Sequence, residues 1–185
     1  MKELSLNILD ITENSLKAGS SLTEISISEA GERLEIKITD NGKGMKAEVV
    51  AAVTNPFYTT RTTRSVGLGI PLLKLQAEQA GGSLEIESRH IEEFPDSHGT
   101  VVIAVFDKSN IDCTPLGNIV ETMLTLIQGH PESDFLFNHK IEQKEVLLDT
   151  RQLREVLGDV PLNNYEVIKW IEEYLSEQYS EIYNK

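Results

Sequence analysis

Three polar residues near the N-terminus have the spacing of one helix face. Asp10, Asn14 and Lys17 follow one another at intervals of four and three residues, opposite an apolar stripe that includes Ile8. An Asn amide oxygen can ligate Mg²⁺, a Lys ammonium can balance phosphate charge, and an Asp carboxylate can orient or deprotonate a nucleophile. The three together suit a phosphate site, although the same pattern is typical of a solvated helix surface.

Two glycine-containing segments could bring the backbone close to a ligand. The first, D-N-G-K-G-M at residues 40–45, ends an expected strand, and Asp40 there could accept a hydrogen bond from an exocyclic amine. The second, G-L-G at residues 67–69, opens an expected helix, whose free N–H groups bind phosphate. Each motif alone is a weak signal, because an ordinary turn or helix start has the same composition.

The elements that must position these residues are three expected helices and four expected strands. Apolar periodicity predicts helices over residues 2–18, 46–53 and 70–80, and alternation predicts strands over 24–29, 33–40, 83–88 and 100–106. Residues 54–66 have no periodicity and many hydroxyl groups, which indicates a long functional or disordered loop. The predicted core consists of Leu4, Ile8, Ile11, Ile25, Ile27, Leu34, Ile36, Ile38, Leu84, Ile86, Val101 and Ile103.

The pattern changes after residue 107. A helix is predicted over 116–129, a hairpin from 135–140 and 145–149, and two helices over 150–158 and 164–182. We therefore divide the chain into a domain at residues 1–107 and a small C-terminal α+β domain at residues 108–185, whose function the sequence does not reveal.

Composition limits the functional classes. The 185 residues carry a net charge of −13, which argues against nucleic acid and anionic membranes as partners, since those bind clusters of Lys and Arg. One cysteine and no metal-ligand spacing around it favour a reducing, cytoplasmic setting. No apolar run is long enough for a transmembrane helix, and the N-terminus is not typical of a signal peptide.

The order of the motifs resembles the histidine-kinase-like ATPase superfamily, which includes sensor histidine kinases, DNA gyrase, Hsp90-type chaperones and MutL-type ATPases. Asn14 is followed 26 residues later by D-N-G-K-G-M, then by a hydroxyl-rich loop, by G-L-G and by the strand G-T-V-V-I-A-V. The resemblance covers residues 1–107. It implies a two-layer α/β sandwich, with a mixed, mostly antiparallel sheet and helices on one face, plus a small α+β extension.

The resemblance implies ATP and Mg²⁺ as ligands and a role for each matching residue. Asn14 matches the Mg²⁺-ligating Asn, and Asp40 the residue that reads the adenine amino group. Met45 would line the adenine pocket and Thr100 would help to fix the base. The matching positions for nucleotide binding are Asn14, Lys17, Asp40, Gly42, Gly44, Met45, Phe57, Thr60, Arg61, Arg64, Gly67, Leu68, Gly69 and Thr100.

One position departs from the family pattern. Four residues before the Asn, gyrase-like and MutL-like members carry a Glu that activates water, and many sensor kinases carry an Asn. Here the residue is Asp10, whose side chain is one methylene shorter than Glu. We favour Asp10 as the base over Glu13, because successive helix positions are rotated by about 100° and Glu13 points away from Asn14.

The resemblance leaves three functions open. The first is a kinase that transfers the γ-phosphate of ATP to a protein partner in trans, which an Asp10 base suits. The second is an ATP hydrolase in which Asp10 activates water. The third is a binding module that ATP closes over residues 54–66 without obligatory turnover. None of the four histidines has the setting of a phosphoacceptor, and the sequence leaves open whether the chain forms a homodimer.

Overall fold

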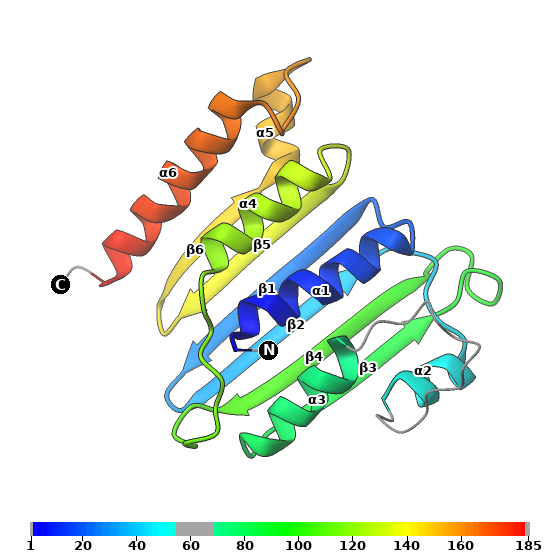
Figure 1. The fold of residues 1–185 in the computed structure, drawn as a ribbon. Coiled ribbons are helices and arrows are strands. Elements are labelled where there is room, and N and C mark those ends of the chain that lie inside the picture. The colour runs from blue at the N-terminus through cyan, green and yellow to red at the C-terminus, as the bar shows by residue number, and fades with distance from the viewer. Residues whose placement is uncertain (1, 55–68, 184–185) are drawn as a thin grey trace.

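The computed structural model describes residues 2–54 and 69–183. Within these ranges the strands occur as consecutive pairs along the chain, and one or two helices separate each pair from the next (Figure 1). The elements are α1 (Leu4–Lys17), β1 (Leu22–Ala30), β2 (Arg33–Asp40), α2 (Ala47–Val53), α3 (Gly69–Gln79), β3 (Ser83–Arg89), β4 (Gly99–Asp107), α4 (Ile119–Gly129), β5 (Asp134–Ile141), β6 (Lys144–Asp149), α5 (Thr150–Leu157) and α6 (Tyr165–Tyr183).

The strands form a mixed sheet of the expected kind. Its order is β3-β4-β2-β1-β5-β6, and all neighbours are antiparallel except β1 and β5, which are parallel. Helices α1, α3 and α4 lie across one face of the sheet (Figure 1). The prediction of a two-layer α/β sandwich is therefore confirmed. No helix within the described ranges is long and apolar enough to cross a membrane.

The segment after residue 107 extends the same sheet. Strand β5 pairs with β1 along its whole length, from Leu22 opposite Asp134 to Glu29 opposite Ile141. One hydrophobic cluster joins side chains from both parts of the chain, such as Ile25 on β1 and Phe135 on β5. The two-domain division stays a prediction, and the structure adds that the two parts share a sheet and a core.

The core prediction holds for α1, β1 and β2, whose eight predicted residues are all buried. In β4 it was wrong, because Val101 and Ile103 are only partly buried and the opposite side of the strand faces the helices. Every position from 101 to 106 is apolar, so alternation could not distinguish the two sides. The buried side chains of β4 are Val102, Ala104 and Phe106.

A buried polar cluster ties α6 to the sheet. His139 on β5 is 1% exposed, and its Nε2 lies 3.0 Å from a carboxylate oxygen of Glu29 on β1. Its Nδ1 lies 2.8 Å from the hydroxyl of Tyr179 on α6, and Lys108 pairs with the other Glu29 oxygen at 2.9 Å. Burial lowers the pKa of His139, so the ring is neutral and both of its nitrogens have a partner.

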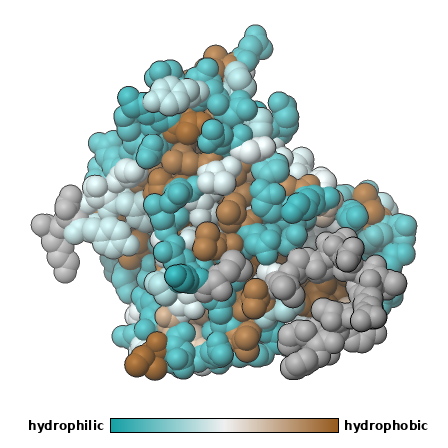
Figure 2. Space-filling model, viewed as in Figure 1, coloured by the Kyte–Doolittle hydropathy of each residue, from teal (hydrophilic) through white to brown (hydrophobic). Residues whose placement is uncertain are grey.

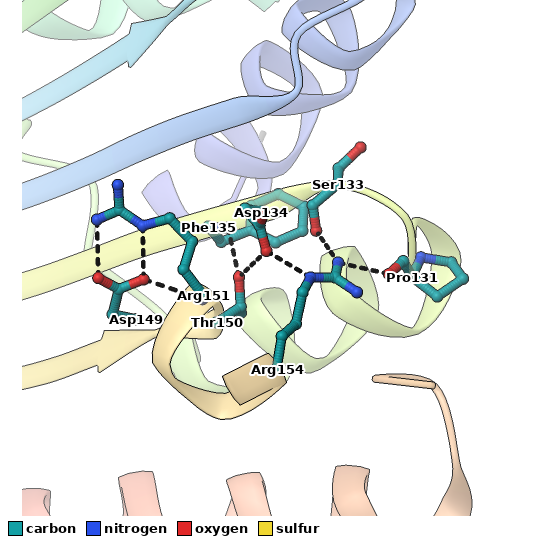
Figure 3. Close-up of polar contacts among 8 residues, drawn as sticks. All are labelled: Pro131, Ser133, Asp134, Phe135, Asp149, Thr150, Arg151 and Arg154. Atoms are coloured by element: carbon teal, nitrogen blue, oxygen red, sulfur yellow. Dashed lines mark hydrogen bonds and ion pairs between the residues drawn. The ribbon is translucent and has the colours of Figure 1, made fainter. Parts of the chain in front are cut away.

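A second cluster fixes α5 at the beginning of β5 (Figure 3). Arg154 pairs with Asp134 at 2.7 Å and donates to the carbonyls of Pro131 and Ser133 at 2.6 and 3.0 Å. Thr150 donates to the same Asp134 oxygen at 2.9 Å. Because Arg presents its donors in a rigid planar fork, one side chain holds the whole turn between α4 and β5.

The exposed side of the helical layer is mostly hydrophilic, and apolar residues appear on it as separate patches (Figure 2). Leu6 on α1 and Leu75 on α3 are 43% and 47% exposed. Exposed apolar side chains of this kind are common in globular proteins.

Candidate functional site

A cleft of about 760 Å³ lies beside the C-terminal half of α1. Its walls come from α1, α2, the start of α3, the end of β2, the start of β4, and the residues that follow β2 and β3. This volume is typical of small-molecule sites. The predicted site residues that line it are Asp10, Asn14, Lys17, Asp40, Gly44, Met45 and Thr100.

Helix α1 presents its polar face to the cleft because its apolar face is buried against the sheet. Its first turn is capped by backbone, since Leu4 and Ser5 donate their N–H groups to the carbonyls of residues 115 and 116. Within the described ranges, the side chains of Asn14 and Lys17 form no hydrogen bond or ion pair with another residue. Both side chains are therefore available to a ligand.

The carboxylate of Asp40 lines the same cleft beside Ser15 of α1, and both of its oxygens accept a hydrogen bond. Ser15 donates to Oδ2 at 2.7 Å, and the backbone N–H of Gly42 donates to Oδ1 at 2.8 Å. Thr100 lies opposite Asp40 in the pairing of β2 with β4. Each carboxylate oxygen keeps a further lone pair, so the group can still accept a hydrogen bond from a ligand.

The turn after β2 is held from several sides. Gly44 has φ +68°, and a Cβ there would overlap the carbonyl oxygen of Arg89, so a glycine is required. His98 contacts the carbonyl of Gly42 through Nδ1 at 2.6 Å, which requires that this nitrogen carry the proton. Lys43 donates its N–H to the carbonyl of Ala18 at 3.0 Å. These contacts fix the wall of the cleft next to Asp40.

The start of α3 lies against Asp10. A Cβ at Gly69 would overlap the Asp10 carboxylate, so this glycine permits a close approach between the carboxylate and the helix start. Ile70, the next residue of α3, is buried and lines the cleft. The remaining predicted residues, Phe57, Thr60, Arg61, Arg64, Gly67 and Leu68, lie outside the described residues.

Cations and carboxylates both line the cleft of this strongly acidic protein, and the carboxylates are those of Asp10 and Asp40. Lys17, Lys43 and Lys46 all line it, although the chain as a whole has a charge of −13. Lys46 pairs with Glu92 at 2.6 Å, and this hydrogen bond raises the pKa of Lys46. An anionic ligand would thus meet cations here despite the unfavourable overall charge.

Sequence reasoning missed three residues that support the site. Ser15, Ser88 and His98 form hydrogen bonds to predicted residues or to the turn that carries them. Ser15 follows the Asn of the first motif, and Ser88 continues the inward-facing row of β3 after Ile86. Their positions were visible in the sequence. Their partners were not, because these lie on other strands and helices.

Residues 2–110 match the family described as histidine kinase-, DNA gyrase B- and HSP90-like ATPase. This match covers more than half of the chain, so the protein belongs to that family.

Several curated relatives are sensor kinases. The chain is 26% identical over 113 residues to a putative NtrY-like sensor histidine kinase of Rickettsia conorii, which is 60% of this chain and 18% of that protein. It is 32% identical over 84 residues to the sensor histidine kinase ZraS of Escherichia coli K12, 44% of this chain and 18% of ZraS. It is 33% identical over 88 residues to sporulation kinase D of Bacillus subtilis, and the match covers 48% of this chain and 17% of that kinase. The chain spans less than a fifth of the length of these relatives.

A similar solved structure is the MutL ATPase domain of Aquifex aeolicus in complex with ADP. The TM-score is 0.54 at 14% identity, and the match covers 94% of this chain and 88% of that one. At this identity the likeness shows the fold, and its coverage extends the likeness into the C-terminal part of the chain. Family membership supports ATP binding by this domain.

Proposed function

We propose that the chain binds ATP with Mg²⁺ in this cleft and transfers the γ-phosphate to a protein partner in trans. One observation carries the proposal. A carboxylate and an amide on one face of α1, Asp10 and Asn14, line the same cleft as Asp40 and Thr100 of the sheet. The first pair is suited to phosphate chemistry and the second to recognition of a base.

The adenine would occupy the end of the cleft near Asp40. Ile38 and Val102 are buried apolar side chains on the cleft wall, and Met45 is a partly buried one. Apolar walls with a few placed polar groups are the usual setting of a base. The exocyclic amine of adenine would donate to the carboxylate of Asp40, which keeps free lone pairs for it.

The phosphates would lie toward Asn14, Lys17 and the beginning of α3. The first N–H groups of a helix attract phosphate, and the ammonium of Lys17 adds a full positive charge. Asn14 fits a role in holding Mg²⁺, because its side chain lines the cleft and has no partner among the described residues. The ion supplies charge neutralisation of the phosphates when it is bound.

The described residues contain no group of three or more His, Cys, Asp or Glu side chains that could hold a metal. A magnesium ion would therefore be held by Asn14 together with phosphate oxygens and water, as is common for this ion.

Asp10 would act as the general base. A hydroxyl oxygen of the partner attacks the γ-phosphorus, the bond from that phosphorus to the bridging oxygen breaks, and ADP leaves. Asp10 takes the proton of the attacking hydroxyl. Its carboxylate lines the cleft beside the start of α3, where the γ-phosphate would lie. ATP hydrolysis is the second candidate function, because the same carboxylate could take a proton from water.

The histidines support transfer in trans. His98 contacts the Gly42 carbonyl, His130 contacts Glu13 at 2.8 Å, and His139 is buried. His90 alone among the four lines the cleft, next to the turn that carries Met45. An acceptor on a partner protein fits this distribution better than one of these rings.

The fate of the γ-phosphate tests the proposal. The protein is incubated with Mg²⁺ and γ-labelled ATP, beside Asn14→Ala, Asp10→Asn and the control Glu13→Gln. Glu13 lies on the same helix and does not line the cleft. Transfer to an added partner should fall by about 10²–10⁴-fold in Asp10→Asn while ATP binding persists. Asn14→Ala should weaken binding of Mg²⁺-ATP, and Glu13→Gln should leave both properties unchanged.

Each other outcome has a definite meaning. Label released as free phosphate, and lost in Asp10→Asn, would replace the kinase by a hydrolase. Label retained on the protein would refute transfer in trans and point to His90. ATP binding without any transfer or release, in the presence of candidate partners, would favour a nucleotide-gated binding module.

A further inference from the structure

Asp40 and Thr100, the two polar residues proposed to recognise the base, each contact a serine. Ser15 Oγ lies 2.7 Å from Asp40 Oδ2, and Ser88 Oγ lies 2.8 Å from Thr100 Oγ1. Neither serine is among the residues that the sequence predicts to bind the nucleotide. The two serines come from different elements, α1 and β3, and their partners Asp40 and Thr100 lie opposite each other on β2 and β4.

Ser15 fixes the orientation of the Asp40 carboxylate. The serine is 5% exposed, and its alternative acceptor, the Ile11 carbonyl, is more distant at 3.3 Å. With Gly42 N–H on the other oxygen, the carboxylate has one donor on each side and cannot rotate without breaking both bonds. Held in this way, Asp40 presents only lone pairs to the cleft.

Ser88 fixes Thr100 through a cross-strand row. Asp40, Thr100 and Ser88 lie side by side on β2, β4 and β3. Ser88 accepts the backbone N–H of Met45 at 2.7 Å, and the Gly99 carbonyl is 3.1 Å from its hydroxyl. One serine hydroxyl thus links the side chain of Thr100 to the turn that forms the pocket wall.

We propose that Ser15 and Ser88 are positioning residues that set the base selectivity of the site. The inference rests on the proposed nucleotide function and deepens it. A carboxylate fixed as an acceptor takes a hydrogen bond from a 6-amino purine and repels the oxygen of a 6-oxo purine. Without its serine, the side chain of Asp40 or Thr100 can reorient to fit a 6-oxo purine. The preference of the site for a 6-amino purine therefore decreases.

The test compares two nucleotides that differ at one position of the base. Dissociation constants for ATP and inosine triphosphate, each with Mg²⁺, are measured by calorimetry for the wild type, Ser15→Ala and Ser88→Ala. Ser83→Ala is the matched control, because Ser83 lies on β3 and is exposed on the opposite side of the strand. Thermal melting of each variant checks that it is folded.

In Ser15→Ala and in Ser88→Ala, the ratio of the inosine triphosphate dissociation constant to the ATP dissociation constant should fall by about fivefold to tenfold. This is the effect expected of one hydrogen bond. The loss should arise from weaker ATP binding, with inosine triphosphate little changed. Ser83→Ala should keep the wild-type ratio. In an Asp40→Asn background, Ser15→Ala should no longer change the ratio, because the pair acts as a unit.

Three results would overturn the inference. If ATP and inosine triphosphate weaken by the same factor, the serines are merely structural. If a wild type that prefers ATP keeps its preference in both variants, only this inference fails and the proposed function stands. If the wild type binds neither nucleotide, the proposed function fails and the inference with it.

Discussion

The hydroxyl of Tyr179 offers a precise perturbation of the C-terminal part of the fold. Tyr179→Phe removes one oxygen and keeps the ring that packs on His139, with ring centroids 5.7 Å apart. The Nε2–H of His139 donates to Glu29, so the neutral ring must accept at Nδ1, and Tyr179 is the donor. Burial raises the pKa of Tyr179, so its proton stays in place throughout the neutral range.

The expected cost follows from burial. His139 is 1% exposed, so water cannot replace the lost donor, and a buried acceptor without a partner costs about 1–3 kcal/mol. We expect the free energy of unfolding to fall by that amount. Urea titration followed by the fluorescence of Trp170, the only tryptophan and a residue of α6, measures it.

Tyr183→Phe is the matched control. Tyr183 is 67% exposed and stacks on Tyr179 with centroids 6.3 Å apart. Its change in unfolding free energy should stay within about 0.5 kcal/mol, as is usual for a surface substitution. Equal losses in the two variants, or a loss below about 0.5 kcal/mol in Tyr179→Phe, would refute the account of the buried cluster.

Three further predictions concern the stability of the protein in acid, the substitution of a backbone glycine and the removal of the C-terminal part of the chain. The folded state binds the His139 proton less readily than the unfolded state, so stability should decrease as the pH falls below about 6.5 and through the lowered folded pKa. Burial raises the pKa of Glu29, but Lys108 and His139 outweigh it and lower the pKa, so further stability is lost below about pH 4.5. Gly44→Ala should lower the free energy of unfolding by about 1–3 kcal/mol, measured by urea titration, and should weaken nucleotide binding, measured by calorimetry. A chain that ends at residue 107 should be poorly soluble, or should be unfolded when its secondary structure is measured by circular dichroism, because β1 loses its partner β5.

Each of these has its own control. His139→Gln should reduce the slope of stability against pH between about 7 and 5.5, and an unchanged slope would assign the acid sensitivity to other groups. Gly129→Ala should be neutral or stabilising, since nothing lies within 4 Å of a Cβ there and the residue ends α4. A folded, nucleotide-binding chain of residues 1–107 would show that the boundary near 108 separates independent domains.

The sequence predicted the elements well because most of them have strong periodicity. Each expected helix and strand exists within a few residues of its predicted bounds, and Asp10, Asn14 and Asp40 share one cleft. The side of β4 could not be predicted, since its apolar run has no alternation. The parallel pairing of β5 with β1 could not be predicted either, because it joins segments more than 100 residues apart and no local pattern encodes it.

The support of the site by Ser15, Ser88 and His98 was missed for a related reason. Their residue types are ordinary in turns and strands, and their importance depends on which atoms the fold brings within 3 Å of them. Motifs identify the groups that meet a ligand. The groups that orient those side chains emerge only from the packing of α1, β3 and β4.

The place of β5 in the sheet also bears on how the chain folds while it is being synthesised. Strand β1 is complete at residue 30, whereas its second neighbour is complete only at residue 141. At ribosomal rates of about 5–20 residues per second, roughly 5–20 seconds separate the two events. During that time β1 has only β2 beside it, and its other edge remains open to pairing with foreign strands. The nascent chain therefore has the residues that line the candidate cleft well before it has β5, the second neighbour of β1 in the sheet.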